Sequence, residues 1–353
     1  MTSFPPLPPI LPTPVARLAP GSVSPALVAA LHTGVVVARA DIGVLALTGP
    51  GALTCLQGLL TSDLEKPGDG AFVYGALLTP KGMIVVDGWA ARLGPTVSYT
   101  VPAGGREQAR AIFTRSVPPR LARLADHTAE LAVYRLAGPA TLGVAEAAGL
   151  PLPPGPGRVV PGSPATAEVA RASEGAPFTL QVTLPAPAAE ALAARLAAAG
   201  AVAGNAAVLE LARILAGWPQ LGAEVDEKTI PQEVRYDEIG GVSYTKGCYT
   251  GQETVARLHF RGHTNRHLCG LMFDAEPPAP PADGWSAVTH LDRDVGRVTS
   301  LAFVPESGVA GGGRWIGLAV VRREVGPGSV VRAAGRDARV VDLPFAVPFV
   351  APA

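Results

Sequence analysis

The chain of 353 residues has little cysteine, few aromatic residues and no excess charge of either sign. Its three cysteines are odd in number and show no C-x-x-C spacing, so we expect a reducing cytoplasm rather than a disulfide framework. Lys plus Arg equals Asp plus Glu, at 29 each, so no overall field attracts nucleic acid or an anionic membrane. No apolar run reaches the roughly 18 residues of a membrane span. The Pro-rich start has the pattern of neither a signal peptide nor an anchor, and we expect a soluble protein.

The abundant residues are hydrophobic (48%), with 41 glycines and 36 prolines, a composition typical of a globular protein with many turns. The length suffices for two or three domains of roughly 100 to 200 residues each. We expect a Pro-rich tail over residues 1–20 and a body over 21–275, built from two interleaved subdomains. A Pro-rich linker after residue 275 precedes a C-terminal domain over 276–353.

Local patterns indicate an α+β body in which helices cover strand-rich sheets. Ser24 and Pro25 form the start of a helix that Gly34 ends. The apolar runs 72–79 and 83–91 flank turn residues 80–82 and predict a hairpin. The stretch 136–182 is rich in Ala, Pro and Gly, its segment 150–157 is predicted to be a loop or linker, and we expect no functional residues there.

The C-terminal segment has short, evenly spaced strand patterns, which are typical of a small β-barrel. The predicted strands cover residues 295–302, 315–321, 330–333 and 338–343, and the last two form a hairpin about Gly335. The fold class predicted for the whole chain is therefore an α+β body of sheets with covering helices, followed by a small β-barrel.

Residue types that are rare elsewhere in the chain concentrate in the segment 246–257, which reads KGCYTGQETVAR. Lys246 lies two residues before Cys248, and a nearby ammonium favours the reactive thiolate. A helix that begins near Thr250 has the same effect through its N-terminus. Gly247 and Gly251 allow a close backbone approach. Tyr249, Gln252 and Glu253 supply a stacking ring and hydrogen-bonding groups for a flat heterocycle.

The alternative is that these residues are structural, because a lone cysteine is often a small buried apolar residue and glycines often serve turns. Cys55, beside Leu56 and Leu59, is most simply a core residue. For Cys248 we favour a functional role, because Lys, Cys, Tyr, Gln and Glu occur together within eight residues of a chain that uses them sparingly.

Lys246 to Glu253, followed by Val255-Ala256-Arg257, resembles the K-G-C-Y-x-G-Q-E signature of the YgfZ-type folate-binding proteins, relatives of the glycine-cleavage T-protein. The resemblance extends to Leu56-Gln57-Gly58, Thr61-Ser62-Asp63, Leu78 to Gly82, Arg213-Ile214, Pro231-Gln232-Glu233, Gly296 to Ser300 and Pro344-Phe345. It implies a three-part body that binds tetrahydrofolate or a one-carbon derivative and supports the assembly or repair of iron-sulfur enzymes, with client or assembly proteins as partners.

The resemblance also implies the site residues. Cys248 is the reactive thiol, assisted by Lys246, and no metal site is implied. The expected folate contacts are Tyr249, Gly251, Gln252, Glu253, Arg257, Glu233 and Asp87.

Some positions depart from the aminomethyltransferase branch of this family. That branch carries an acid pair on the strand after the K-G turn, with the second acid catalytic, whereas here Asp87 is followed by Gly88. The next strand lacks the branch's asparagine, and Leu215 replaces a glutamate. These departures argue against ordinary transferase turnover and favour an accessory role. A folate-dependent aminomethyl or one-carbon transferase using Asp87, and a non-enzymatic scaffold for a partner protein, are the alternatives.

Two further groups of residues follow the motif. His259, His263 and His267 recur every four residues before Cys269, but Gly262 interrupts the helix, so we expect a solvent-facing strand and loop rather than a metal site. A basic cluster, Arg257, Arg261 and Arg266, either holds the carboxylates of a folate tail or is merely solvated.

Overall fold

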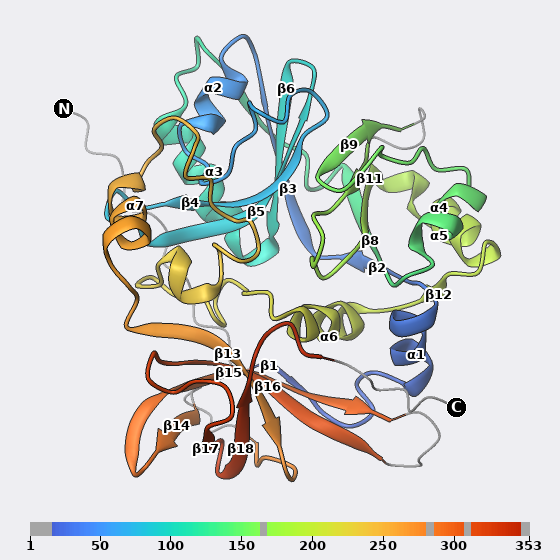
Figure 1. Ribbon diagram of the computed structural model, residues 1–353. Helices are drawn as coiled ribbons and strands as arrows, with labels where there is room; N and C mark the ends of the chain where they lie inside the picture. The colour runs from blue at the N-terminus through green and yellow to red at the C-terminus, as the bar shows by residue number, and fades with distance from the viewer. Residues whose placement is uncertain (1–15, 163–167, 280–285, 307–311, 347–353) are drawn as a thin grey trace.

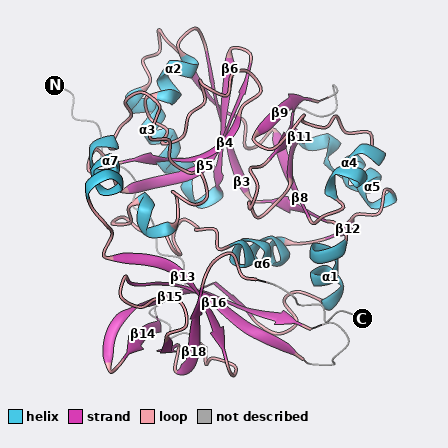
Figure 2. Cartoon of the chain, viewed as in Figure 1, coloured by secondary structure: helices cyan, strands magenta, loops and turns pink. Residues whose placement is uncertain are grey.

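The computed structural model describes residues 16–162, 168–279, 286–306 and 312–346. Most of the predicted Pro-rich tail, residues 1–15, lies outside these ranges. Within them the strands form three sheets, two side by side and a third that closes into a barrel below them (Figures 1 and 2). The predicted α+β architecture with a C-terminal barrel is confirmed.

The first sheet is antiparallel, with the strand order β4-β5-β6-β3-β7. The predicted hairpin is present, and Gly82 has a φ of 87° in its turn, a conformation that glycine adopts without strain. Helices α2 and α3 pack on this sheet, and its core is the largest apolar cluster of the described chain. The bounds are β3 Ile42–Thr48, β4 Phe72–Leu78, β5 Ile84–Leu93, β6 Thr96–Pro102, β7 Arg123–Asp126, α2 Ala52–Gln57, η1 Ala103–Gly105 and α3 Arg106–Ser116.

The second sheet has the order β12-β2-β8-β11-β10-β9 and is covered by α4 and α5. Three of its strands come from 158–185, where the sequence predicted no strand, whereas the predicted loop over 150–157 is present. Alternating apolar residues such as Val169, Val182 and Leu184 outweigh the Ala and Pro content, because they bury one face of the sheet. The bounds are β2 Val36–Ala40, β8 Leu131–Ala137, β9 Arg158–Pro161, β10 Glu168–Arg171, β11 Leu180–Pro185, β12 Val202–Ala203, α4 Thr141–Ala147, η2 Ala186–Ala188 and α5 Ala189–Ala198.

The barrel closes through the order β15-β14-β17-β18-β13-β16, because β16 pairs back with β15. Strand β1 adds to it in parallel with β15. The barrel therefore takes residues from before position 276, where the sequence predicts it to start, and from the predicted tail; the division into domains itself stays a prediction. The bounds are β1 Ala16–Leu18, β13 Arg266–Phe273, β14 Ser286–His290, β15 Arg293–Pro305, β16 Gly313–Arg322, β17 Val330–Ala333 and β18 Arg336–Val341.

Helices α1 (Pro25–Thr33) and α6 (Ala206–Ala216) lie between the second sheet and the barrel (Figure 1). The Ser24 side chain caps α1 by accepting from the Leu27 amide, as the sequence predicts, and Asn205 caps α6 in the same way. An apolar cluster joins Val36, Leu211, Ile214 and Leu318, so the helices connect sheet and barrel through a shared core. The remaining elements are the short turn η3 (Pro231–Val234) and α7 (Gln252–Arg261).

No helix among the described residues is both long and apolar enough to cross a bilayer.

Candidate functional site

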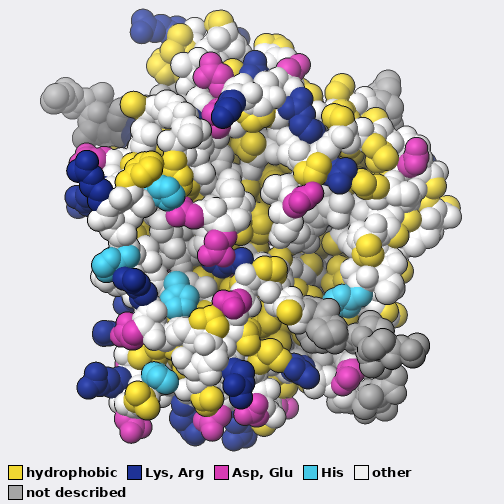
Figure 3. All heavy atoms as spheres, viewed as in Figure 1, with side chains coloured by type: hydrophobic (Ala, Val, Ile, Leu, Met, Phe, Trp, Pro, Cys, Tyr) yellow, Lys and Arg dark blue, Asp and Glu magenta, His cyan; other side chains and the backbone are white. Residues whose placement is uncertain are grey.

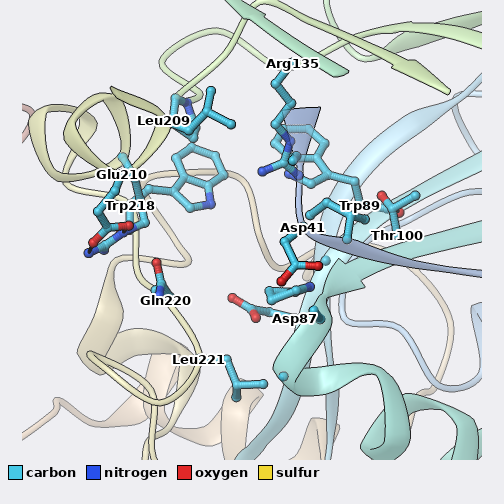
Figure 4. A pocket seen from close by; sticks show the side chains of 18 of the residues that line it. Asp41, Asp87, Trp89, Thr100, Arg135, Leu209, Glu210, Trp218, Gln220 and Leu221 are labelled. Atoms are coloured by element: carbon cyan, nitrogen blue, oxygen red, sulfur yellow. Dashed lines mark hydrogen bonds and ion pairs between the residues drawn. The ribbon is translucent and has the colours of Figure 1, made fainter. Parts of the chain in front are cut away.

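A cavity of about 690 Å³ lies where the two upper sheets meet α6 and the loop that follows it. The molecular surface is hollowed between the sheets, with hydrophobic side chains in the hollow (Figure 3). Trp218, Leu209 and Leu221 line one side, and Asp87, Trp89 and Arg135 lie across from them (Figure 4). The volume is in the usual range for sites that bind small molecules.

Asp87, on β5, is the buried carboxyl group of this cavity, with a residue exposure of 3%. Its Oδ2 accepts hydrogen bonds from the hydroxyls of Tyr74, at 2.5 Å, and Tyr236, at 3.2 Å. Its Oδ1 is buried and accepts no hydrogen bond from another residue within the described part of the chain. Burial raises the pKa of the Asp87 carboxyl, and the two tyrosine hydrogen bonds oppose that rise. The site thus holds an oriented carboxyl oxygen that lacks a donor.

Aromatic rings surround this carboxyl group. Trp89 and Trp218 are nearly parallel, at an interplanar angle of 11° with centroids 5.8 Å apart. Phe178 packs edge-on against Trp89 at 5.1 Å, and Tyr74 packs edge-on against Trp218 at 4.8 Å. In a chain with only 5% aromatic residues, this concentration forms an apolar wall suited to a flat ring.

The loop that carries Trp218 is held by a buried ionic network. Arg213 donates from Nη1 to the Trp218 carbonyl at 2.6 Å and to Glu224 Oε2 at 2.9 Å. Its Nη2 bonds Glu210, and Glu224 Oε2 also accepts from the Gln220 amide at 3.0 Å. Because the loop's polar groups are satisfied by fixed partners, the wall is shaped before any ligand arrives.

The cysteine motif lies elsewhere. Of the site residues predicted from the sequence, only Asp87 is among those that line the cavity within the described ranges. Helix α7 begins at Gln252, as the sequence predicts, and packs beside the β4–β5 turn (Figure 1). A Cβ added to Gly251 would come within 2.6 Å of the Thr79 carbonyl, so this glycine is needed for the close packing.

Lys246 serves the backbone rather than the cysteine. Its Nζ donates to the carbonyls of Gln57, Leu60 and Ser62, at 2.8, 2.6 and 2.8 Å. These three bonds use all of the ammonium's donors, so none is left for Cys248. Burial lowers the pKa of Lys246 to about 8, opposed by the charges of Asp63 and Glu65.

Tyr249 is buried, with the Lys246 Nζ 5.3 Å from its ring centroid, so its ring packs inside the protein. Gln252 is half-buried, while Glu253 and Arg257 are exposed on α7. Glu233 Oε2 accepts from the Ile230 amide at 3.4 Å, and burial raises the pKa of the Glu233 carboxyl. Folate contacts by these residues stay a prediction.

Cys248 is exposed, Cys55 is half-buried and Cys269 is buried. The reactive role of Cys248 stays a prediction. Of the histidines, His259 stacks on Tyr244 at 3.6 Å and faces Asp237, whereas His267 lies on β13. In the described part of the chain no three His, Cys, Asp or Glu side chains gather as a metal site would require.

Sequence reasoning missed most of the cavity: Trp89, Trp218, Phe178, Arg135 and the salt bridges of Arg213. Phe178 falls in the stretch where no functional residue was expected. The scarcity of tryptophan, with four in the chain, was the available signal, because rare aromatic residues are often used at binding sites.

The GCVT N-terminal domain family matches residues 29–149. An aminomethyltransferase from Rubrobacter xylanophilus is 31% identical over 321 residues, which cover 86% of this chain and 81% of the relative. The tRNA-modifying protein YgfZ from Vibrio vulnificus is 37% identical over 134 residues, and the match spans only 39% of that protein's length. A YgfZ from Escherichia coli is 49% identical over 55 residues, 16% of this chain and 17% of the relative.

Among solved structures, the glycine cleavage system aminomethyltransferase T from Bartonella henselae matches with a TM-score of 0.72. That match covers 92% of this chain and 89% of the other, at 19% identity, and so concerns the fold. Together with the K-G-C-Y-x-G-Q-E segment, these similarities show that the chain is a YgfZ-type member of the GcvT-like family, to which the aminomethyltransferases belong.

Proposed function

We propose that this protein binds a reduced folate in the central cavity, with the pterin ring at Asp87. The unpartnered Asp87 Oδ1 is the observation that carries the proposal. A pterin presents an amino group and a ring N–H side by side, and a buried carboxylate is the acceptor that such a pair requires. The faces of Trp89 and Trp218 provide the apolar contact for the ring.

The membership in a family of folate-associated proteins supports this ligand. The basic cluster of Arg257, Arg261 and Arg266, the expected site for the folate tail, is exposed and does not line the cavity. Arg39 does line it and is exposed. We therefore assign the glutamate carboxylates of the tail to Arg39 in place of that cluster.

Calorimetry with 5-formyltetrahydrofolate tests the binding proposal. Asp87→Asn removes the charged acceptor and should weaken binding about tenfold or more, the usual effect of losing a hydrogen bond to a charged group. Asp41→Asn, at an exposed aspartate of the same cavity, is the matched control and should bind as the wild type does.

The pH dependence of binding provides a second test. Because burial raises the pKa of Asp87, wild-type affinity should fall as the pH drops through that pKa, and Asp87→Asn should not show this fall. The absence of any heat at millimolar folate would overturn the proposal.

We further propose an accessory role for iron-sulfur enzymes, with Cys248 as the reactive group. Gly88 supports a role without transferase turnover, because a Cβ at this position would collide with the Thr100 carbonyl. No acidic side chain fits there without moving β6. The exposed Cys248 is accessible to a partner protein, and tRNA-modifying enzymes are one class of clients to examine, since the YgfZ relatives are named for that process.

Cells that lack the protein test the accessory role. Their iron-sulfur enzymes should lose activity, and Cys248→Ala should fail to restore it although the variant folds. Cys55→Ala, which changes a half-buried cysteine beside the apolar core, should restore it. Equal rescue by both variants would remove Cys248 from the mechanism.

A folate-dependent aminomethyltransferase is the second candidate, favoured by the 31% identity to such an enzyme over most of the chain. It would have to use Asp87 alone. A purified protein that transfers methylene groups from an aminomethyl carrier to tetrahydrofolate, and loses that activity in Asp87→Ala, would establish it.

A further inference from the structure

Arg135 projects a guanidinium group into the cavity, and its described hydrogen bonds reach only a neutral acceptor (Figure 4). Nε and Nη2 both donate to Gln181 Oε1, at 3.2 Å each. Within the described residues, Nη1 makes no hydrogen bond and Arg135 takes part in no salt bridge. The cavity therefore contains unused cationic donors as well as the unused acceptor of Asp87.

The guanidinium group is held in place. Its Cζ lies 4.2 Å from the centroid of the Phe178 ring. Gln181, which is fully buried, also donates from Nε2 to Thr100 Oγ1 at 3.3 Å. This chain of contacts fixes the position of Arg135 relative to β6.

Thr100, which Gln181 connects to Arg135, lies near Asp87 in the first sheet. Thr100 on β6 is the register partner of Trp89 on β5, and its hydroxyl donates to the Trp89 carbonyl at 3.1 Å. Asp87 and Trp89 are alternate residues of β5 and both line the cavity, so they share one face of the strand. Burial lowers the pKa of Arg135 to about 10, opposed by Tyr74 and Asp87, and the group stays charged at neutral pH. Arg135 and Asp87 thus present a donor and an acceptor to the same cavity, on the side that carries Trp89.

We propose that Arg135 donates to the 4-oxo group of the pterin while Asp87 accepts from the adjacent N3–H and 2-amino groups. The cavity then selects 2-amino-4-oxopteridines over their 4-amino analogues. This inference rests on the proposed folate binding, because it assigns the orientation of that ligand. A 4-amino group would place N–H donors against the donors of Arg135, and the ring N3 would offer a lone pair to the carboxylate of Asp87.

Calorimetry with tetrahydrofolate and 4-amino-4-deoxytetrahydrofolate, which differ only at C4, tests the inference. The wild-type protein should bind the 4-oxo compound at least about tenfold more tightly. Arg135→Met keeps an unbranched apolar stem but removes the donors, and should lower the affinity ratio several-fold, mainly by weakening the 4-oxo compound, while the contribution of Asp87 remains. Arg39→Met changes the residue assigned to the glutamate tail, which the two compounds share, so it should weaken both to the same extent and keep the affinity ratio of the wild type.

The outcomes separate this inference from the proposed function. Equal wild-type affinities for the two compounds would overturn the selectivity but leave folate binding established. A ratio that persists in folded Arg135→Met, as judged by circular dichroism, would remove Arg135 from the recognition. If that variant does not fold, Arg135→Leu, which also removes the donors, provides the same comparison. Absence of binding to 5-formyltetrahydrofolate and to both test compounds would overturn the proposed function and the inference together.

Discussion

The Arg213 guanidinium donates from Nη2 to the Ser300 hydroxyl, 2.7 Å away, and so joins helix α6 to barrel strand β15. Ser300 in turn donates to Glu224 Oε1 at 2.7 Å. Glu224 is fully buried and also holds the backbone of the loop that carries Trp218. The Ser300 hydroxyl thereby links the barrel to one wall of the cavity, although within the described residues no barrel strand lines that cavity.

Ser300→Ala should therefore affect both stability and ligand binding. The change leaves Glu224 Oε1 without its donor and should lower the free energy of unfolding by about 1–3 kcal/mol. It should also weaken 5-formyltetrahydrofolate binding, because the loop of Trp218 loses a support. Urea unfolding and calorimetry measure the two effects.

Thr299→Val is the matched control for Ser300→Ala. The Thr299 hydroxyl is equally buried but donates to the Leu318 carbonyl inside the barrel, at 3.0 Å. This variant should lose stability and retain folate affinity. If both variants weaken binding to the same extent, the barrel acts through general stability and not through the Arg213 network.

Lys246→Met should destabilise the fold, because three buried carbonyls lose a charged donor. We expect a loss of roughly 2–4 kcal/mol at pH 7 in urea unfolding. Lys66→Met, at an exposed lysine of the same region, should change the free energy of unfolding by less than about 0.5 kcal/mol.

The difference in the free energy of unfolding between the wild type and Lys246→Met should increase with pH. In the folded protein the pKa of Lys246 is about 8, whereas the ordinary value is 10.5, so between these values the unfolded state binds more protons. Wild-type stability should therefore rise relative to Lys246→Met between pH 8 and 10, by up to about 1 kcal/mol per pH unit. A difference that shrinks over this range would show that burial does not lower the pKa of Lys246.

Local sequence patterns correctly predicted those helix ends and turns that a few neighbouring residues determine. The cap at Ser24 and the Gly82 turn each depend on a few neighbouring residues, and both are present as predicted. The helix after Thr250 and the barrel strands followed from the same kind of pattern.

The cavity could not be predicted in this way, because its residues meet only through tertiary packing. Asp87, Arg135 and Trp218 come from separate strands and a loop, and no local pattern links them. Lys246 shows the same limit. Its sequence position suggests a partner for Cys248, but the carbonyls after helix α2 capture its ammonium group.

Gly88→Asp tests whether a transferase acid can be restored. A Cβ here collides with the Thr100 carbonyl, so the change should cost more than about 2 kcal/mol of stability and create no transfer activity. Gly104 also lines the cavity, and a Cβ added there meets nothing within 4 Å, so Gly104→Asp should cost less than about 1 kcal/mol. A stable Gly88→Asp protein with transferase activity would show that β6 can shift.

Cys248 should be the most readily alkylated of the three cysteines, on grounds of access. Burial raises the pKa of Cys55, and it raises the pKa of Cys269 to about 12, so both of these thiols are disfavoured as thiolates near neutral pH. Cys248 is the exposed one of the three. Brief iodoacetamide treatment at pH 7.5, followed by peptide mass spectrometry, should label Cys248 first; all three cysteines should react once the protein is unfolded in urea. Earlier labelling of Cys55 would indicate that helix α2 opens, and would shift the search for the reactive thiol to that helix.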